Sequence, residues 1–253
     1  MLKNFSAEKF DIIIQAGQSN AQGCGIGDVG SPFVPSDDIW YMNCDLTISL
    51  AAEAAEGNFV VGNFALPFAE EYVSDGRLKH GRKLLILRSA VGGTGFADNR
   101  WGLRDDLYLT MIEMIVTSLG LNPENRLAAF IWHQGENDAA NGASYDTHYK
   151  NLRTLVETVR DGFGRSDLPF IAADFVHHWK NENPALCEPV ANAIKNVCAD
   201  IGNARFIETD GLTSNWQRLG YGDDNIHFSR DAIYILGKKY YRAFVEIAGA
   251  AAL

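Results

Sequence analysis

The sequence predicts an α/β fold in which helices cover both faces of a parallel sheet of about five strands. Two observations lead to this fold class. Short apolar runs, rich in β-branched residues, alternate with longer segments in which apolar residues have helical spacing. The apolar runs also lack polar alternation, which is typical of parallel strands that are buried on both faces. We therefore expect right-handed crossovers from each strand to the next.

The first predicted strand, residues 10–14, leads into a turn of small residues that contains Gly17, Ser19 and Asn20. Gly17 allows a sharp turn, and Ser19 then follows the carboxyl end of the strand, where open α/β sheets hold their ligands. A helix that begins at or after Asn20 would point backbone N–H groups toward negative charge beside Ser19. Ser19 is therefore a candidate nucleophile, with helix capping as the alternative role.

The other elements follow in chain order. Strands are expected at residues 39–42, 83–90, 126–132, 169–175 and 204–207. Helices are expected at residues 67–74, 104–119, 144–163, 185–201 and 230–247, with Ser229 as the cap of the last one. Residues 23–38 are expected to be loop, and residues 46–63 irregular. Without a repeat or a linker, residues 1–253 are expected to form one domain.

Charge and composition narrow the possible partners. The chain has 22 Lys and Arg against 32 Asp and Glu, a net charge of −10, which argues against nucleic acid and anionic membranes as main partners. Residues 1–9 lack the apolar segment of a secretory signal, and no apolar run could span a bilayer. The chain has four cysteines, Cys24, Cys44, Cys187 and Cys198, and their spacing is not that of a metal site. Cys187 and Cys198 are expected to lie three turns apart on one helix, too far apart to form a disulfide. These features favour reduced thiols and a cytoplasmic location.

Polar turns follow three of the predicted strands, and another polar segment precedes the last helix. Because the carboxyl ends of parallel strands share one edge of the sheet, these segments are expected to meet there. Their residue types suit acyl transfer: Ser19 needs a base, for which His227 is the candidate, and Asp224 can orient that histidine. Donors for an oxyanion are available from the backbone N–H of Ser19, an N–H in 92–93, and the side-chain amide of Gln134.

Other residues in these segments have alternative roles. Asp223 could orient the histidine in place of Asp224, although the spacing DxxH favours Asp224. Glu136 and Asp138 could be catalytic carboxylates, but they are expected to bond the turn backbone and hold Gln134 in place. His133 is expected to be a structural hydrogen-bonding residue.

Candidates for metal and substrate binding lie outside the triad. His177 and His178 follow a strand end and could look like metal ligands, but no third ligand accompanies them at a suitable spacing, so a role in a pocket wall or at the surface is expected. No metal or other cofactor is expected. Asn20, Trp101 and Trp179 are candidate substrate contacts. Aromatic faces suit sugar rings, and ordinary packing is the equal alternative for the two tryptophans.

Four blocks of the chain together resemble the SGNH hydrolase superfamily. They are GQSN, GGT, HQGEND and DNIH at residues 17–20, 92–94, 133–138 and 224–227. More narrowly, they resemble the branch of sialate O-acetylesterase-like enzymes and carbohydrate esterase family 6 acetylxylan esterases. All four occur in the order of that branch and span nearly the whole chain. The resemblance implies a flavodoxin-like three-layer fold and a serine esterase that removes acetyl groups from a small acetylated carbohydrate without a metal.

The resemblance also implies a role for each matched residue. Ser19 is the nucleophile, His227 the base and Asp224 its partner, and Gly93 and Gln134 complete the oxyanion hole with the Ser19 N–H. Gly92 remains an alternative to Gly93. A general short-chain esterase or thioesterase of the same superfamily and a non-catalytic sugar-binding relative are the competing functions. An α/β-hydrolase is disfavoured because the chain has no GxSxG elbow.

Overall fold

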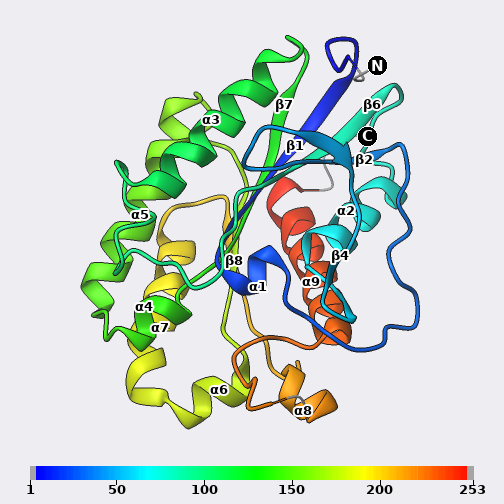
Figure 1. Ribbon diagram of the computed structural model, residues 1–253. Helices are drawn as coiled ribbons and strands as arrows, with labels where there is room; N and C mark the ends of the chain where they lie inside the picture. Colours follow the sequence, from blue (N-terminus) through cyan, green and yellow to red (C-terminus); the bar gives the residue numbers. More distant parts are fainter. Residues whose placement is uncertain (1–3, 221, 250–253) are drawn as a thin grey trace.

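The computed structural model, which describes residues 4–220 and 222–249, is a three-layer α/β/α structure (Figure 1). Within those residues the central sheet has seven strands in the order β3-β2-β6-β1-β7-β8-β9. The strands are β1 (Lys9–Gly17), β2 (Ile39–Met42), β3 (Ile48–Leu50), β6 (Arg82–Arg88), β7 (Arg126–His133), β8 (Phe170–Ala173) and β9 (Ala204–Ile207). All neighbours pair in parallel except β2 and β3, which are antiparallel.

The predicted fold class is confirmed, and the predicted strand number is too low. The strands β6-β1-β7-β8-β9 have the flavodoxin-like order 2-1-3-4-5. The strands β2 and β3 extend this unit at one edge. The expected strand at 39–42 is therefore present, whereas β3 lies in a segment that was expected to be irregular.

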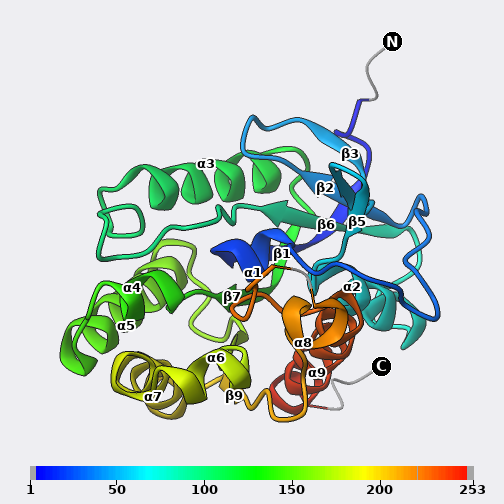
Figure 2. The same ribbon diagram turned by 60° about the horizontal axis from the view of Figure 1, so that its bottom comes forward.

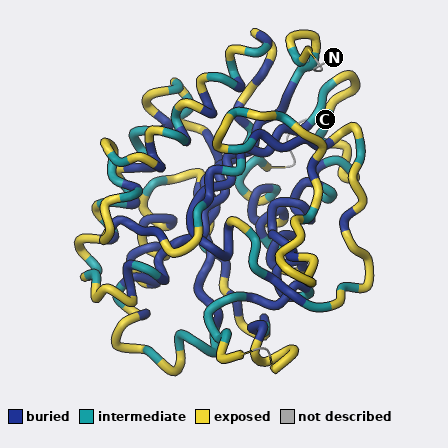
Figure 3. Tube along the Cα trace, in the orientation of Figure 1, coloured by how far each residue is buried: buried dark blue, intermediate teal, exposed yellow. Residues whose placement is uncertain are grey.

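Helices cover both faces of the sheet, as Figure 1 shows. On one face lie α3 (Asp106–Gly120), α5 (Tyr145–Gly162) and α7 (Pro184–Asp200), and on the other lie α2 (Ala65–Ser74) and α9 (Arg230–Ala248). The side chains of β1 alternate between the two layers: Ile12 and Ile14 join the core under the first set of helices, and Ile13 joins the core under the second. Figure 3 shows the resulting buried centre.

Several short elements were not predicted. They are the helices α4 (Glu136–Ala140), α6 (His177–Glu182) and α8 (Asn215–Leu219), and the hairpin strands β4 (Ala54–Glu56) and β5 (Phe59–Val61). Strands of three residues are too short to show a period in the sequence. Ser229 is at the N-cap position of α9, but its hydroxyl donates to Asp231 Oδ1 (2.6 Å) and does not accept from the helix backbone.

The short helix α1 (Ser19–Gln22) follows β1 at the carboxyl end of the sheet, where α4, α6 and α8 also lie (Figure 2). Gly17 makes this approach possible: its φ is +128°, and a Cβ there would lie 2.1 Å from the carbonyl oxygen of His133. The next N–H, that of Gln18, donates to the same carbonyl (2.9 Å). Gly17 therefore fixes the end of β1, and with it Ser19, against the end of β7.

The cysteines are free thiols, and Cys187 and Cys198 both lie buried on α7, as expected. None of the helices in residues 4–220 and 222–249 combines the length and the hydrophobicity that a membrane-spanning helix needs.

Candidate active site

Ser19, His227 and Asp224 form a continuous chain of contacts at the carboxyl edge of the sheet. His227 Nε2 lies 2.9 Å from Ser19 Oγ, and His227 Nδ1 lies 2.8 Å from Asp224 Oδ1. Ser19 comes from the end of β1, whereas the other two residues come from the loop before α9. The structure therefore joins the first and last of the four sequence blocks.

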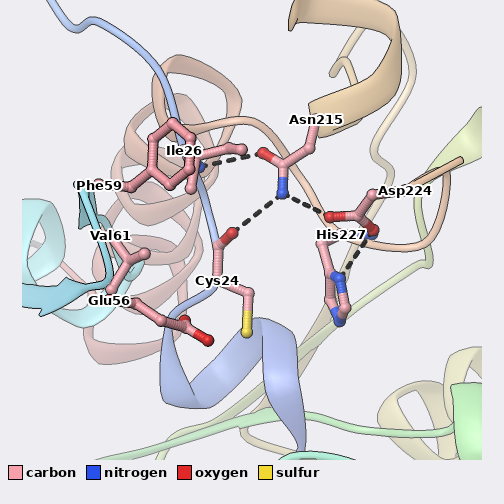
Figure 4. Close-up of a pocket in the computed structure, with 8 residues that line it drawn as sticks. All are labelled: Cys24, Ile26, Glu56, Phe59, Val61, Asn215, Asp224 and His227. Carbon is pink, nitrogen blue, oxygen red and sulfur yellow. Dashed lines mark hydrogen bonds and ion pairs between the residues drawn. The ribbon is translucent and has the colours of Figure 1, made fainter. Parts of the chain in front are cut away.

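Asn215 holds the loop that carries His227, and the sequence analysis did not single it out. Its side-chain amide donates to Asp224 Oδ2 (2.8 Å) and to the carbonyl of Cys24 (3.0 Å), and its Oδ1 accepts from the N–H of Ile26 (3.0 Å), as Figure 4 shows. The Asn215 N–H also donates to the carbonyl of His227 (2.9 Å). The sequence did contain a signal for the start of α8, the helix that carries Asn215, because Ser214 and Gln217 have the spacing of a capping box.

The two acids beside His227 have different surroundings. Partial burial acts to raise the pKa of Asp224, but hydrogen bonds from His227 and Asn215 hold this pKa below its usual value. The carboxylate of Asp224 is therefore ionised at neutral pH. Asp223 is exposed, and the contact with the His227 ring is made by Asp224.

Backbone donors surround Ser19. Gly92 lies next to it, since a Cβ on Gly92 would be 3.5 Å from Ser19 Cβ, but the Gly92 N–H is already bonded to Gln22 Oε1 (2.7 Å). In the described part of the chain, no acceptor bonds the N–H of Ser19 or of Gly93. Of the two glycines, Gly93 therefore has the available donor.

Gln134 lies beneath the turn and is only 1% exposed. Its Nε2 has long contacts, 3.2 Å to Asp138 Oδ2 and 3.4 Å each to Gln18 Oε1 and the carbonyl of Thr94. Asp138 also accepts from the N–H of Ala97 (2.7 Å), which fits the expectation that this acid bonds turn backbone. Gln134 is not among the described residues that line the cleft at Ser19.

A second buried acid, Glu136, accepts a hydrogen bond from Asn20, the residue that follows Ser19. Asn20 Nδ2 donates to Glu136 Oε1 (2.8 Å) and to the carbonyl of Ile226 (3.0 Å), and Asn20 Oδ1 accepts from the N–H of Phe228 (3.1 Å). Asn20 is completely buried. It therefore attaches the Ser19 turn to the His227 loop and has no surface for a substrate. His133 Nε2 lies 3.3 Å from the same carboxylate.

The two tryptophans for which sugar contact and packing were equal alternatives both make packing contacts with other aromatic side chains. Trp101 is 0% exposed, and it packs edge-on against Trp132, so it has no face for a ligand. Packing is therefore the role of Trp101. Trp179 is half-buried on α6 and packs against Phe175, and its contact with a substrate stays a prediction.

His177 and His178 also lie on α6, and each faces an acid. His177 Nδ1 is 3.4 Å from Asp210 Oδ1, and His178 Nε2 is 3.4 Å from Glu182 Oε1. Within the described residues, no group of three or more His, Cys, Asp or Glu side chains could hold a metal ion.

Two adjoining hollows open at His227. The first is the cleft at Ser19, which includes the residues Gln22, Gly92, Gly93 and Asn137. The second is the hairpin pocket, lined by Cys24, Ile26, Glu56, Phe59, Val61, Asn215, Asp224 and His227 (Figure 4). Burial raises the pKa of the Cys24 thiol to about 12, so this thiol is uncharged at neutral pH and is a poor nucleophile.

Comparison with known proteins gives one family and a shared fold. Residues 9–246 match a family model described as carbohydrate esterase, sialic acid-specific acetylesterase. A probable 9-O-acetyl-N-acetylneuraminic acid deacetylase of Escherichia coli (strain K12) is 28% identical over 111 residues, which cover 40% of this chain and about a third (34%) of that protein. The crystal structure of NanS has a TM-score of 0.78 at 18% identity, covering 95% of this chain and 98% of that one. A protein from Arabidopsis thaliana has a TM-score of 0.72 at 21% identity, covering 93% and 98%.

Proposed function

Because the chain belongs to the carbohydrate esterase family of sialic acid-specific acetylesterases, we propose that it is a carboxylic ester hydrolase that removes O-acetyl groups from a sugar. The observation that carries the proposal is the unbroken contact chain from Ser19 through His227 to Asp224. A hydroxyl at 2.9 Å from an imidazole nitrogen, with the other nitrogen against a carboxylate, is the arrangement that activates a serine. We infer that residues 1–253 form one esterase domain.

The proposed reaction has two halves. Ser19 Oγ attacks the acetyl carbonyl carbon while His227 Nε2 takes the hydroxyl proton, and the tetrahedral oxyanion then expels the sugar oxygen, which receives that proton from His227. The product is a free sugar hydroxyl and an acetyl ester on Ser19. A water molecule, deprotonated by His227, then attacks this ester, and acetate leaves as Ser19 regains its proton. Asp224 stabilises the imidazolium in both halves.

The oxyanion is proposed to bind the N–H groups of Ser19 and Gly93. Both are free of other acceptors among the described residues, so neither has to break a bond first. The family resemblance adds the amide of Gln134. Its three contacts are all 3.2 Å or longer, so turning toward an oxyanion would cost little.

The substrate is proposed to be a small acetylated carbohydrate, either of the sialic-acid type or of the acetylated-xylan type. The E. coli relative, by its name, acts on an acetylated neuraminic acid, and this favours the first type. A cytoplasmic location, and the absence of nucleic acid and membrane as partners, remain predictions.

A substrate panel tests the proposal. We expect release of acetate from p-nitrophenyl acetate and from at least one of two sugar substrates, O-acetyl sialate and acetylated xylo-oligosaccharides, and little cleavage of octanoyl esters. Faster turnover of octanoyl than of acetyl esters would indicate a general esterase. Sugar binding without acetate release from any ester would indicate a non-catalytic relative and overturn the proposal.

A further inference from the structure

The hairpin pocket adjoins the catalytic groups but contains none of the proposed oxyanion donors. The hairpin β4–β5 forms one side of it, and Asn215, Asp224 and His227 form the other (Figure 4). The hairpin pocket and the cleft at Ser19 share Cys24, Glu56 and His227. The two hollows are therefore neighbours that share His227 in their walls.

We propose that the hairpin pocket binds the alcohol part of the ester, an uncharged, hydroxyl-bearing part of a sugar, and that Phe59 and Glu56 select it. This inference rests on the proposed function. In the first half of that reaction His227 protonates the oxygen that leaves, so the alcohol must lie on the side of His227. His227 lines both hollows, whereas Gly93, a proposed oxyanion donor, lines only the cleft at Ser19, which leaves the hairpin pocket for the alcohol.

The chemistry of the lining fits a sugar. Ile26, Phe59 and Val61 give one apolar wall, against which the C–H face of a sugar ring can pack. Glu56 supplies carboxylate oxygens that accept hydrogen bonds from hydroxyl groups. An apolar wall beside hydrogen-bond acceptors matches a sugar, which has both C–H faces and O–H groups.

Charge in the hairpin pocket selects against anions. Glu56 and Asp224 are both acidic, and no Lys or Arg is among the described residues that line the pocket. A carboxylate in this space would meet two negative groups without a counter-charge. If the substrate is an acidic sugar, its carboxylate must therefore lie outside the pocket, and only its uncharged arm enters.

The hairpin offers a matched pair of residues for a test. Phe59 and Val61 line the pocket, whereas Val60 between them does not, because successive side chains of a strand point to opposite faces. Phe59 is 39% exposed and Val60 is 47% exposed. Truncation of either side chain therefore removes a similar degree of exposed apolar surface from the same strand, but only one of the two truncations alters the pocket.

The experiment compares Phe59→Ala, Phe59→Tyr and Val60→Ala on two esters. The first is the acetylated sugar that the wild-type protein hydrolyses best, and the second is ethyl acetate, whose alcohol is too small to reach the hairpin. We expect Phe59→Ala to lower kcat/KM on the sugar about tenfold, which corresponds to about 1.4 kcal/mol, and to leave ethyl acetate unchanged. Phe59→Tyr keeps the aromatic face and should retain most activity, and Val60→Ala should match the wild type on both esters.

A second pair of variants tests the acceptor. Glu56 also lines the cleft at Ser19, so Glu56→Ala is expected to lower kcat/KM on the sugar more than on ethyl acetate, and Glu56→Gln, which keeps one acceptor oxygen, should lower it less. Equal losses on both esters, or equal effects of Phe59→Ala and Val60→Ala, would overturn the inference, since the hairpin would then only support His227. Hydrolysis of neither ester by the wild type would instead overturn the proposed function on which the inference rests.

Discussion

Asn215 is predicted to set the activity of His227 without contacting it through its own side chain. Replacing it with alanine removes the hydrogen bond to the Asp224 carboxylate and two bonds to the backbone of Cys24 and Ile26. A bond to a charged group contributes about 1.5–3 kcal/mol and a neutral one about 1 kcal/mol. Asn215→Ala should therefore lower the free energy of unfolding by about 3–5 kcal/mol.

The same change should lower kcat about tenfold. The carboxylate of Asp224 would then bond His227 alone, so the imidazole would be less well oriented when it becomes charged in the transition state. A tenfold loss corresponds to about 1.4 kcal/mol. This is close to the lower end of the free energy that a hydrogen bond to a charged carboxylate contributes, about 1.5–3 kcal/mol. The assay is kcat on p-nitrophenyl acetate at a temperature where circular dichroism shows that the variant is folded. Arg218→Ala is the control and should change little: Arg218 lies on α8, as Asn215 does, and its loss breaks an exposed ion pair with Asp231 of α9.

The pH dependence of stability gives an independent measurement. Because the pKa of Asp224 is lower in the folded protein, its ionisation stabilises the fold above the pKa of the unfolded chain, and this contribution is lost as the pH falls through the folded pKa. Without Asn215 the lowering is smaller. The difference in free energy of unfolding between wild type and Asn215→Ala should therefore shrink as the medium becomes acidic. A kcat within twofold of wild type, together with a pH-independent difference in stability, would refute the reasoning.

Four further predictions concern the proposed triad, the oxyanion hole and metals. Ser19→Ala should fold normally and lose at least about 10³ in kcat, and near-wild-type turnover would exclude it as the nucleophile. Asp224→Asn should lower kcat and move or abolish the acid limb of the pH–rate profile that we assign to His227. Gln134→Ala should lower kcat about 10²–10³ with the same acid limb and KM if its amide binds the oxyanion; a lower melting temperature with normal kcat would make it a support for the turn. Activity should survive EDTA and dialysis, whereas loss that zinc restores would point to His177 and His178 as ligands.

The elements that were predicted well are those whose residues lie in long runs of one period. The strand at 10–14 is an example, because it is buried on both faces and is therefore apolar along most of its length. The helix at 144–163 is another, because its buried stripe repeats with helical spacing. The Ser19–His227–Asp224 contacts could also be anticipated. Strand order places Ser19 at the carboxyl edge, and the DxxH spacing lets Asp224 fold back onto His227.

The features that were missed depend on contacts between distant segments. Asn215 is important because Cys24, Ile26 and Asp224 converge on it, and nothing near residue 215 in the sequence indicates these partners. The hairpin β4–β5 has only three residues in each strand, which pair with each other and not with the main sheet. The role of Trp101 stayed open between packing and a sugar contact for a similar reason, since an aromatic residue in a loop has the same sequence pattern whether it faces a ligand or another tryptophan.

The proposed catalytic pair, Ser19 and His227, comes from two segments that lie far apart in the sequence, and this has a consequence for protein synthesis. Ser19 follows the first strand, whereas His227 comes just before the last helix, 208 residues later. A nascent chain on the ribosome therefore carries the serine long before the base for it has emerged. The Ser19 turn also requires that β1 be enclosed between β6 and β7, a slow, non-local pairing. Esterase activity would thus report synthesis past His227 and closure of the sheet, and chains that stop before His227 would be inert.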